Sequence, residues 1–303
     1  MLRRLGYVAI ALSIEATTNR TCRLRNATPA LLRRLIALNL EGLHAVLQFN
    51  VQNGILLYRI SSQIIPFASH PVNRVPWWDE FRADFERLRA FIRRHDMRVS
   101  MHPGQFTVLN SPRAAVVEAS LKEIEWHIRF LDCLAPDASH KVVIHVGGAY
   151  GNKVAAADRF VQAVRRLPES WRRRLVIEND ERVYATEDVL AISRATGLPV
   201  AFDWLHHTAS SGGRLPTTRT LEACFDTWKE GDGLPKVHFS SQAPGGRKGQ
   251  HANWIRAAEF ERFLETAPER DFDCMLEAKC KDLALFRLRR ELQRRGMAGP
   301  WAA

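Results

Sequence analysis

Cysteine is scarce in this sequence, and its five residues form no pattern that would build a metal site or a disulfide framework. Their number is odd and no Cys-x-x-Cys pair occurs, so we expect reduced thiols in a cytoplasmic protein. Uninterrupted apolar runs are also short, below the roughly 18 residues of a membrane-spanning helix, so no membrane partner is expected. Glu15 follows the first apolar run where a signal peptide would have small residues, which favours a buried strand there.

Three familiar sequence signatures are absent as well. The chain has no Gly-x-Ser-x-Gly and no Walker phosphate loop, and no Gly-x-Gly-x-x-Gly follows the first expected strand. The sequence therefore gives no support to a serine nucleophile, an NTPase or a dinucleotide-binding fold. Its glycine-rich stretch 245–250 is basic, and we expect a mobile loop that brings Arg247 and Lys248 to a nucleic-acid phosphate. The alternative is an ordinary flexible surface loop.

Acidic residues are outnumbered by basic ones, 33 against 44, which gives a formal net charge of +11. This balance favours a polyanion as partner. The alternative is a soluble basic protein whose arginines reflect the base composition of its genome. The 303 residues contain no Pro-, Gly- or Ser-rich linker and no change of composition, so we expect one domain spanning residues 1–303.

Short β-branched runs alternate with amphipathic segments along the chain. Most of the runs are continuously apolar, as parallel strands covered on both faces require. Eight strand–helix repeats are the count of a (β/α)8 TIM barrel of the α/β class, and a doubly wound open sheet is the rival fold. The expected strands are 6–12, 56–60, 98–101, 141–144, 175–177, 199–202, 236–239 and 274–276. The expected helices are 29–53, 77–95, 113–134, 154–167, 186–196, 217–228, 259–266 and 282–295.

Histidines and acidic residues stand at or beyond the ends of these expected strands. In a TIM barrel the active site gathers at the carboxyl ends of the strands, so residues far apart in the sequence would meet at one rim. Any single one would more often be a helix cap or a hydrogen-bonded histidine, but the set as a whole favours a shared site. The members are five histidines, His102, His145, His206, His238 and His251, and three carboxylates, Glu178, Asp203 and Glu277.

Imidazole nitrogen and carboxylate oxygen are the ligands of Zn²⁺ and Mn²⁺ hydrolytic sites, and Mg²⁺ is a further candidate. Because one ion takes three or four protein ligands, this set implies two or three divalent ions. Without a cation, the three carboxylates would repel each other. Glu178 and Glu277 can bridge two ions roughly 3.5–4 Å apart, the arrangement that cleaves phosphate esters and stabilises a leaving 3′ oxygen. The remaining histidines are expected to be structural (His44, His95, His127 and His140) or to point away from the site (His207).

Several segments, taken together, resemble the UV damage endonucleases. The most specific are ATTNRT, SMHPGQ, IENDE, FDWLHH, PKVH and MLEAKCKD, and the resemblance extends from about residue 4 to residue 285. That family is similar in fold and metal site to endonuclease IV, a barrel enzyme of abasic-site repair. The resemblance implies an enzyme that nicks DNA immediately 5′ to a cyclobutane pyrimidine dimer or a 6-4 photoproduct. The nick would leave a 3′ hydroxyl and a 5′ phosphate, and Mn²⁺ is the favoured metal.

The resemblance also implies roles for individual residues. All eight candidate ligands match metal ligands of the family. Lys236 matches a lysine that family members carry carboxylated, and it would face the same side of its strand as His238. An unmodified Lys236 would instead contact phosphate. His70 matches a family histidine near the metals, with a hydrogen-bonded loop histidine as the alternative. We therefore expect Glu178, Glu277, Lys236 and His70 to take part in catalysis.

Recognition of the lesion is expected to depend on the loop after the third strand. The family uses a Gln–Tyr pair there as a wedge that fills the gap left by flipped bases, and this chain has Gln105 and Phe106. Phe106 would keep the stacking but lose the hydroxyl; packing in the core is its alternative. Tyr7 matches a family residue near the lesion, whereas Ala11 replaces a common asparagine. Arg59 is expected to contact phosphate or to be structural.

The expected partner is UV-damaged double-stranded DNA, bound by a monomer that joins the nucleoid when it acts. Two other functions stay open on the sequence. A sugar isomerase or epimerase barrel also uses His, Glu and Asp around divalent ions, although it needs fewer ions and no basic surface. A non-catalytic damaged-DNA binding protein would keep the barrel and bind lesions without cleaving them.

Overall fold

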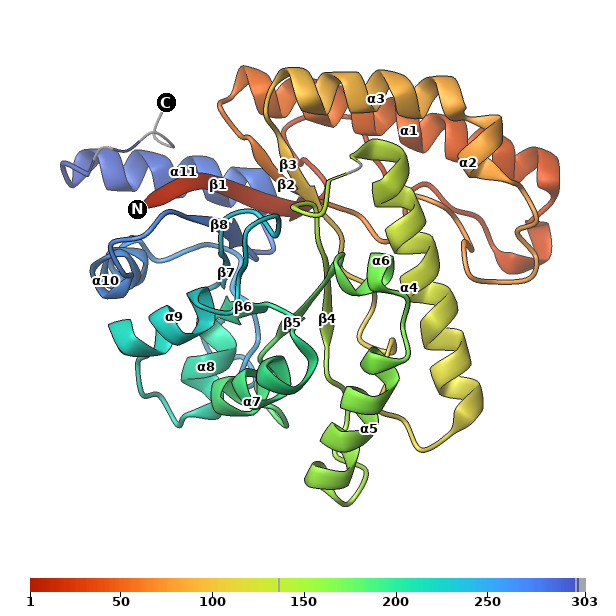
Figure 1. Cartoon of the computed structure of the whole chain (residues 1–303). Coiled ribbons are helices and arrows are strands. Elements are labelled where there is room, and N and C mark those ends of the chain that lie inside the picture. The colour runs from red at the N-terminus through yellow and green to blue at the C-terminus, as the bar shows by residue number, and fades with distance from the viewer. Residues whose placement is uncertain (136, 298, 300–303) are drawn as a thin grey trace.

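The computed structural model describes residues 1–135, 137–297 and 299, and in these ranges strands and helices alternate. Eight parallel strands form the centre of the molecule, and the helices surround them (Figure 1). Most of the strand residues are buried. The strands are β1 (Leu2–Ala9), β2 (Leu57–Ile60), β3 (Arg98–Ser100), β4 (Val142–His145), β5 (Leu175–Glu178), β6 (Val200–Asp203), β7 (Lys236–Phe239) and β8 (Phe272–Leu276).

The strands form a nearly closed barrel. Hydrogen-bonded neighbours follow the order β3-β2-β1-β8-β7-β6-β5-β4, with β1 paired to both β2 and β8. The last gap, between β3 and β4, is bridged just past the end of β3. There the Met101 amide donates to the Lys141 carbonyl at 3.0 Å, and the Val143 amide donates to the Met101 carbonyl at 2.9 Å. The predicted TIM barrel is thereby confirmed, and the doubly wound open sheet is wrong.

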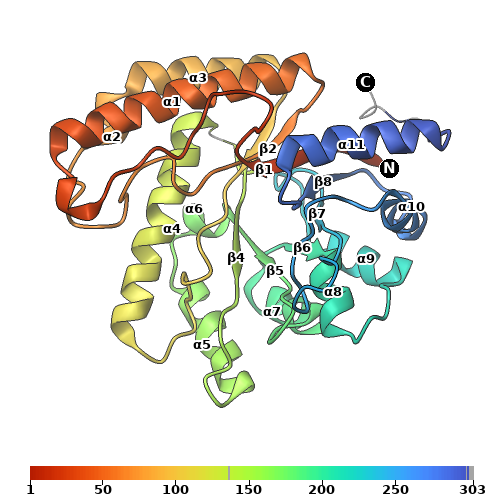
Figure 2. The same ribbon diagram turned by 180° about the vertical axis from the view of Figure 1, so that it is seen from behind.

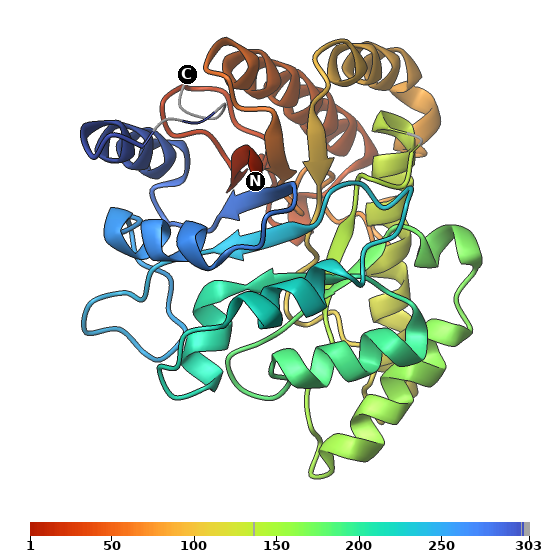
Figure 3. The same ribbon diagram turned by 60° about the vertical axis from the view of Figure 1, so that its left-hand side comes forward.

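Helices cover the outside of the barrel, as the views from behind and from the side show (Figures 2 and 3). Thr28 caps the first long helix by accepting a hydrogen bond from the Leu31 amide, and Pro29 occupies its first position. No helix of the described residues is long and apolar enough to cross a membrane. The helices are α1 (Pro29–Gln52), α2 (Trp77–Glu80), α3 (Arg82–Arg94), α4 (Ala114–Leu134), α5 (Lys153–Arg165), α6 (Glu169–Arg172), α7 (Thr186–Thr196), α8 (Trp204–Ser210), α9 (Thr218–Phe225), α10 (Ala257–Thr266) and α11 (Lys281–Arg294), with a short 3-10 helix η1 (Leu24–Asn26).

Two expected elements differ from the structure, and helix α8 is an addition to the expected ones. The first strand begins at Leu2 and ends at Ala9, several residues earlier than expected. The helix expected over 77–95 is divided into α2 and α3 at Phe81. Helix α8 was not expected; it begins directly after β6 because Asp203 caps it, accepting a hydrogen bond from the His206 amide at 2.6 Å.

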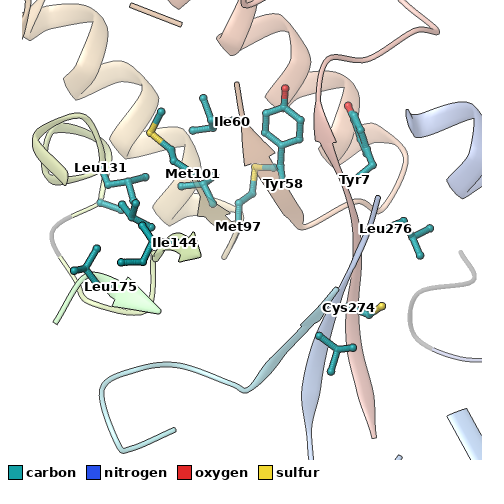
Figure 4. Packing of buried hydrophobic residues seen from close by; sticks show 14 of the residues in the cluster. Tyr7, Tyr58, Ile60, Met97, Met101, Leu131, Ile144, Leu175, Cys274 and Leu276 are labelled. Carbon is teal, nitrogen blue, oxygen red and sulfur yellow. The ribbon is translucent and has the colours of Figure 1, made fainter. Parts of the chain in front are cut away.

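The main core lies between the barrel and its helices. Tyr7 of β1 and Tyr58 of β2 project side by side from adjacent strands into this layer, with ring centroids 5.3 Å apart (Figure 4). Both rings are fully buried. Residues of opposite phase, such as Val143 and Val176, form separate small clusters. Because the apolar side chains pack in the main core and in these small clusters, the carboxyl ends of the strands can carry polar groups.

Candidate metal centre

All eight predicted ligands meet at the carboxyl ends of the strands, and together they are called the metal centre below. His145, Glu178 and Asp203 are the last residues of β4, β5 and β6, and His238 lies within β7. His102, His206, His251 and Glu277 lie in the segments that follow β3, β6, β7 and β8. The prediction that one rim collects these residues is borne out by the distances between their side chains.

Glu178 is the hub of the metal centre. Its carboxylate lies 3.1 Å from His102 Nε2 and 2.8 Å from His238 Nδ1. His145 Nε2 and His206 Nδ1 are 3.7 and 3.8 Å from the same carboxylate. Donor atoms of His102, His145 and Glu178 all lie within 4.8 Å of one another, and so do donor atoms of Glu178, Asp203 and His238. Glu178 therefore belongs to two potential metal-binding groups.

Glu277 contacts the histidines on the other side of the metal centre. Its carboxylate lies 3.2 Å from His238 Nδ1 and 3.7 Å from His251 Nδ1. Asp203 reaches the same region, with its Oδ1 3.6 Å from His206 Nδ1. The rings of His206 and His251 are 5.7 Å apart, so the contacts run without interruption from His102 to His251. Such spacing suits several ions that share carboxylate ligands.

Backbone carbonyls orient three of the histidines. The Nδ1 atoms of His102, His206 and His251 lie 3.0, 3.0 and 2.8 Å from the carbonyl oxygens of Pro103, Asn179 and Glu277. When Nδ1–H donates to a carbonyl, the Nε2 lone pair is free to bind a metal, which is how metalloproteins usually orient a ligating histidine.

Asn179 is a supporting residue that sequence reasoning missed. Its side chain is buried and bonds both the amide and the carbonyl of Asp203, at 2.8 and 3.0 Å. Its own carbonyl accepts from His206. Glu181 was also missed; its carboxylate lies 3.9 Å from His206 Nε2. The IENDE segment could have indicated both residues, because each lies within three positions of Glu178.

Burial and charge perturb the ionisation of the metal centre. Burial raises the pKa of Glu178, but the opposing charge of His238 and hydrogen bonds from His102 and His238 outweigh it and hold the pKa well below its usual range. Burial raises the pKa of Asp203 to about 6, against the opposing effect of His206. For His206, burial lowers the pKa, but Asp203 and Glu178 prevail and raise it to about 9. The acids and imidazoles thus neutralise each other only partly.

The donor set fits divalent cations. Among the described residues, Asp203 Oδ2, His145 Nδ1 and His238 Nε2 are buried polar atoms without a hydrogen-bond partner. Buried polar atoms are seldom left unpaired, since each one costs about 1–3 kcal/mol. Burial also lowers the pKa of His145 to about 4, which keeps its imidazole neutral and able to act as a ligand. Bound ions would satisfy the unpaired oxygen and nitrogen lone pairs of this cluster.

Lys236 lies deeper in the barrel, two residues before His238. Its side chain is fully buried, and its Nζ has no hydrogen-bond partner among the described residues. Burial, together with the charges of Arg98 and Arg59, places its pKa well below the usual value for lysine. A charged phosphate of DNA cannot reach a fully buried amine, so the expectation of a direct phosphate contact is corrected.

Two residues expected at the DNA are placed elsewhere. Tyr7 is fully buried on the helix-facing side of β1, where its hydroxyl donates to Asn50 Oδ1 at 2.8 Å. Tyr7 is therefore a core residue and not a lesion contact. Arg59 forms an ion pair with Glu277, and its side chain is only 15% exposed. The structure thus supports the structural alternative for Arg59, since the metal centre occupies its guanidinium.

The expected wedge residues lie on the surface. Phe106 is 70% exposed, the largest such value for an aromatic side chain in the described chain. Its ring lies over Gly104, where a side-chain carbon would clash with it. Gln105 is exposed and lines a hollow together with His145 and Glu181. The alternative of Phe106 as core filler is wrong.

His70 is an exposed loop residue whose Nδ1 accepts from the Val72 amide at 3.1 Å. It shares a surface hollow with Phe106, and no hydrogen bond or ion pair with the eight ligands is found in the described chain. His207, by contrast, lies as predicted: its Nδ1 is 2.8 Å from the Thr186 hydroxyl, away from the metal centre.

Arg247 and Lys248 occupy the tip of a hairpin loop beside the metal centre. An antiparallel bridge between Gln242 and His251 closes the base of this loop, so it is anchored next to a predicted ligand. Both basic side chains are exposed, and neither has an ion-pair partner in the part of the chain that the structure describes. They are free to meet an anion.

Comparison with known proteins identifies similar chains. The family model described as UV-endonuclease UvdE matches residues 3–299. The UV DNA damage endonuclease of Clostridium perfringens is 38% identical over 285 residues, which cover 94% of this chain and 69% of that protein. The crystal structure of SacUVDE superposes with a TM-score of 0.89 at 36% identity, covering 97% of this chain and 99% of that one.

More distant structures share the fold alone. Endonuclease IV from Thermus thermophilus has a TM-score of 0.55 at 15% identity, covering 95% of this chain and 99% of that one. A D-psicose 3-epimerase from Clostridium cellulolyticum has a TM-score of 0.52 at 14% identity, covering 77% of this chain and 78% of that one. Since a nuclease and an epimerase resemble the barrel equally well, the fold does not discriminate between the two functions.

Proposed function

The chain belongs to the UV-endonuclease UvdE family and is an enzyme of DNA repair, and we propose that it nicks DNA immediately 5′ to UV photoproducts. The substrates are cyclobutane pyrimidine dimers and 6-4 photoproducts in double-stranded DNA, and the products carry a 3′ hydroxyl and a 5′ phosphate. The observation that supports this most is the continuous cluster of eight ligands, with the exposed Phe106 on the same rim. We propose a monomer that works in the cytoplasm on nucleoid DNA.

The eight ligands would hold two or three divalent ions, with Mn²⁺ favoured over Zn²⁺ and Mg²⁺. His102, His145 and Glu178 form one group of donors, and Glu178, Asp203 and His238 form another. Glu277 and His251 extend the second group. Bound ions would supply a water of lowered pKa and would offset negative charge on the phosphate and the leaving oxygen.

The protein's own groups hold this arrangement in place. Glu178 contacts both donor groups, so its two carboxylate oxygens fix the distance between them. Arg59 neutralises and orients Glu277 through their ion pair. Asn179 fixes Asp203 and His206 through backbone contacts. Catalysis that depends on position requires such support, because small displacements of a ligand reduce the rate strongly.

Lys236 suits carboxylation. Its amine is buried and unpaired among the described residues, and burial lowers the pKa of Lys236, which favours the uncharged, nucleophilic form. Attack of that amine on CO₂ forms a C–N bond and releases one proton, giving a carbamate. The product would add an anion next to His238. Mass spectrometry under ¹³CO₂ tests this step, and Lys236→Arg is the control.

Recognition of damage is proposed for Gln105 and Phe106. UV lesions weaken stacking and kink DNA, so extruding the damaged bases costs less than in intact duplex. An exposed ring held above Gly104 can enter the gap and stack on the bases that stay behind. His70, which shares a hollow with Phe106, is proposed to assist from the same side, and His70→Ala tests that role.

The decisive experiment is a cleavage map around one defined thymine dimer. An end-labelled duplex is incubated with the protein and Mn²⁺, and the expected product is a single nick directly 5′ to the dimer with a 3′ hydroxyl. Undamaged duplex and a chelator serve as controls. No nick at the dimer would overturn the proposal. Binding without cleavage would support a damaged-DNA binding protein, and turnover of a ketose in place of nicking would support an epimerase.

A further inference from the structure

Exposed apolar side chains are concentrated at one end of the barrel. Nine large hydrophobic residues are exposed in the described chain. Seven of them lie between the carboxyl end of a strand and the first turn of the helix that follows, and the eighth, Leu215, lies in the loop between α8 and α9. The ninth is the terminal Met1. Exposed apolar groups on one rim indicate contact with a partner. The eight are Leu12, Leu24, Phe106, Tyr150, Val154, Leu215, Trp254 and Leu283.

Three of these residues lie close together, opposite Phe106. Leu12, Trp254 and Leu283 follow β1, β7 and β8, which are consecutive in the barrel as β1-β8-β7. Their side chains are 45%, 37% and 39% exposed. Because β7 lies four places from β3 in a ring of eight strands, Trp254 and Phe106 stand on opposite sides of the metal centre.

Hydrogen bonds join the three segments into one unit, called the platform here (residues 12–13, 252–254 and 279–283). The Lys279 and Cys280 amides donate to the Ala252 and Asn253 carbonyls at 3.0 and 3.1 Å. The buried Asp282 carboxylate accepts from the Leu12 and Ser13 amides at 2.6 and 3.0 Å. Fixed backbones of this kind can present side chains to a ligand with little loss of entropy on binding.

The side chains of the platform are also connected. The Arg287 guanidinium lies 5.1 Å from the centre of the Trp254 ring. Leu283 precedes Arg287 by four positions, so the two share one face of α11. Figures 1 and 2 both show α11 beside β1, and the hydrogen bond from the Leu12 amide to Asp282 ties Leu12 to the start of this helix. The three apolar side chains of the platform therefore stand on segments that are bonded to one another.

Positive charge accompanies this apolar surface. Lys279 is exposed and Lys281 is half-buried, and neither side chain has an ion-pair partner among the described residues. Lys281 adopts a left-handed backbone with φ of 48°, a conformation that non-glycine residues rarely adopt. Glu15 is an exposed carboxylate beyond Leu12, so the cationic side is the one formed after β7 and β8.

We propose that the platform is a second DNA-contact surface, which holds the duplex flank on the side of the metal centre opposite Phe106. Trp254, Leu283 and Leu12 contact the apolar sugar and base surfaces, while Lys279 and Lys281 contact phosphates. A duplex held at both sides of the rim is bent over the metal centre. This inference rests on the proposed function and adds to it the position of the second flank.

The test combines variants with shortened substrates. Nicking kinetics are measured on a duplex with a central thymine dimer and on two duplexes that each lack one flank. Trp254→Ala is expected to raise KM about 5- to 50-fold on the full duplex with kcat unchanged, the size of one lost stacking contact. On the duplex that lacks the platform's flank, wild type and Trp254→Ala should have the same KM. Trp254→Phe should recover most of the loss.

A charge variant gives an independent readout. Lys279→Ala is expected to reduce the salt dependence of KM by about one unit of logarithmic slope, since one phosphate contact is lost. Lys229→Ala, an exposed lysine between α9 and β7 at the other end of the barrel, should leave the slope unchanged. Equal KM for Trp254→Ala and wild type on the full duplex, or equal losses on both shortened duplexes, would overturn the platform alone. A wild-type protein that nicks no damaged duplex would overturn the proposed function and the platform with it.

Discussion

The two ends of the barrel both bury charged residues, but among the described residues the amino end pairs most of them with the chain's own atoms, although Asp273 Oδ1 has no hydrogen-bond partner. At the amino end, the Arg98 guanidinium donates to Asp273 at 2.9 Å and to the carbonyls of Ser139 and Asp232 at 3.0 and 3.1 Å. Lys141 pairs there with Asp232 at 2.5 Å. At the carboxyl end, acids and imidazoles gather, and several of their atoms have no partner.

This difference separates a structural ion network from a ligand site. Ion pairs at the amino end offset part of the cost of burying their own charges, so these pairs do not require a bound ion. Unpaired lone pairs at the carboxyl end cost free energy until a cation binds. The location of unpaired atoms therefore indicates function more clearly than the location of charge, and four predictions test that difference.

The largest effect is expected for Glu178→Gln. The substitution removes the negative charge that His102, His145 and His238 surround, while it keeps the size of the side chain. Loss of a shared ligand should lower kcat on dimer-containing DNA by about a thousand-fold or more, with lesion binding still detectable. Glu181→Gln, a carboxylate at the edge of the centre, should cost far less. Wild-type kcat in Glu178→Gln would remove this residue from the site.

Arg98→Met should affect stability and not chemistry. The change leaves Asp273 as a buried carboxylate whose remaining ion pair among the described residues is the one with Arg4, at 3.6 Å. Breaking a buried ion pair on one side typically costs about 3–5 kcal/mol of the free energy of unfolding. Urea denaturation measures this loss, with the exposed Arg93→Met as control. A drop in kcat at unchanged stability would mean that the amino end takes part in catalysis.

Removal of the metal ions should reduce only the stability and the activity that depend on the carboxyl end of the barrel. A ligand that binds only the folded state at 100 to 1,000 times its Kd stabilises by about 2.7–4.1 kcal/mol. We expect a chelator to lower the Tm and abolish nicking, and Mn²⁺ to restore both. The chelator-induced shift in Tm should be the same in Arg98→Met as in wild type, but smaller in Glu178→Gln. An identical shift in Glu178→Gln would place the ions somewhere else.

The sequence predicted much of this architecture because strand ends and ligand types are local features. His145 and Glu178 were found by their position at the end of apolar runs, and the rim followed from the barrel. Tyr7 was placed near the lesion by the family resemblance. The sequence could not correct this, because strands that are covered on both faces show no alternation of polarity from which the phase of β1 could be inferred. The break at Phe81 has no proline or glycine to mark it.

Contacts between distant segments were beyond prediction for a different reason. Asn179 supports the site through backbone atoms of Asp203 and His206, and every residue type has those atoms. The ion pair of Arg59 with Glu277 joins residues 218 positions apart. Only the folded chain shows which of several arginines reaches that carboxylate. The candidate ligands can thus be predicted from the sequence, whereas the residues that hold them in place can be identified only from the folded structure.

The smallest effect is expected at Phe106, which contacts neither set of charges. Phe106→Ala should leave Tm and the chelator-induced shift unchanged, since the ring is 70% exposed. Preference for damaged over intact duplex should fall by about 1–3 kcal/mol, the value of one stacked base. Phe106→Tyr is the matched control and should keep the preference, because stacking needs the ring and not the hydroxyl. If Phe106→Ala discriminates as well as wild type in competition binding, the lesion is read elsewhere on the rim, and the metal centre works without a wedge.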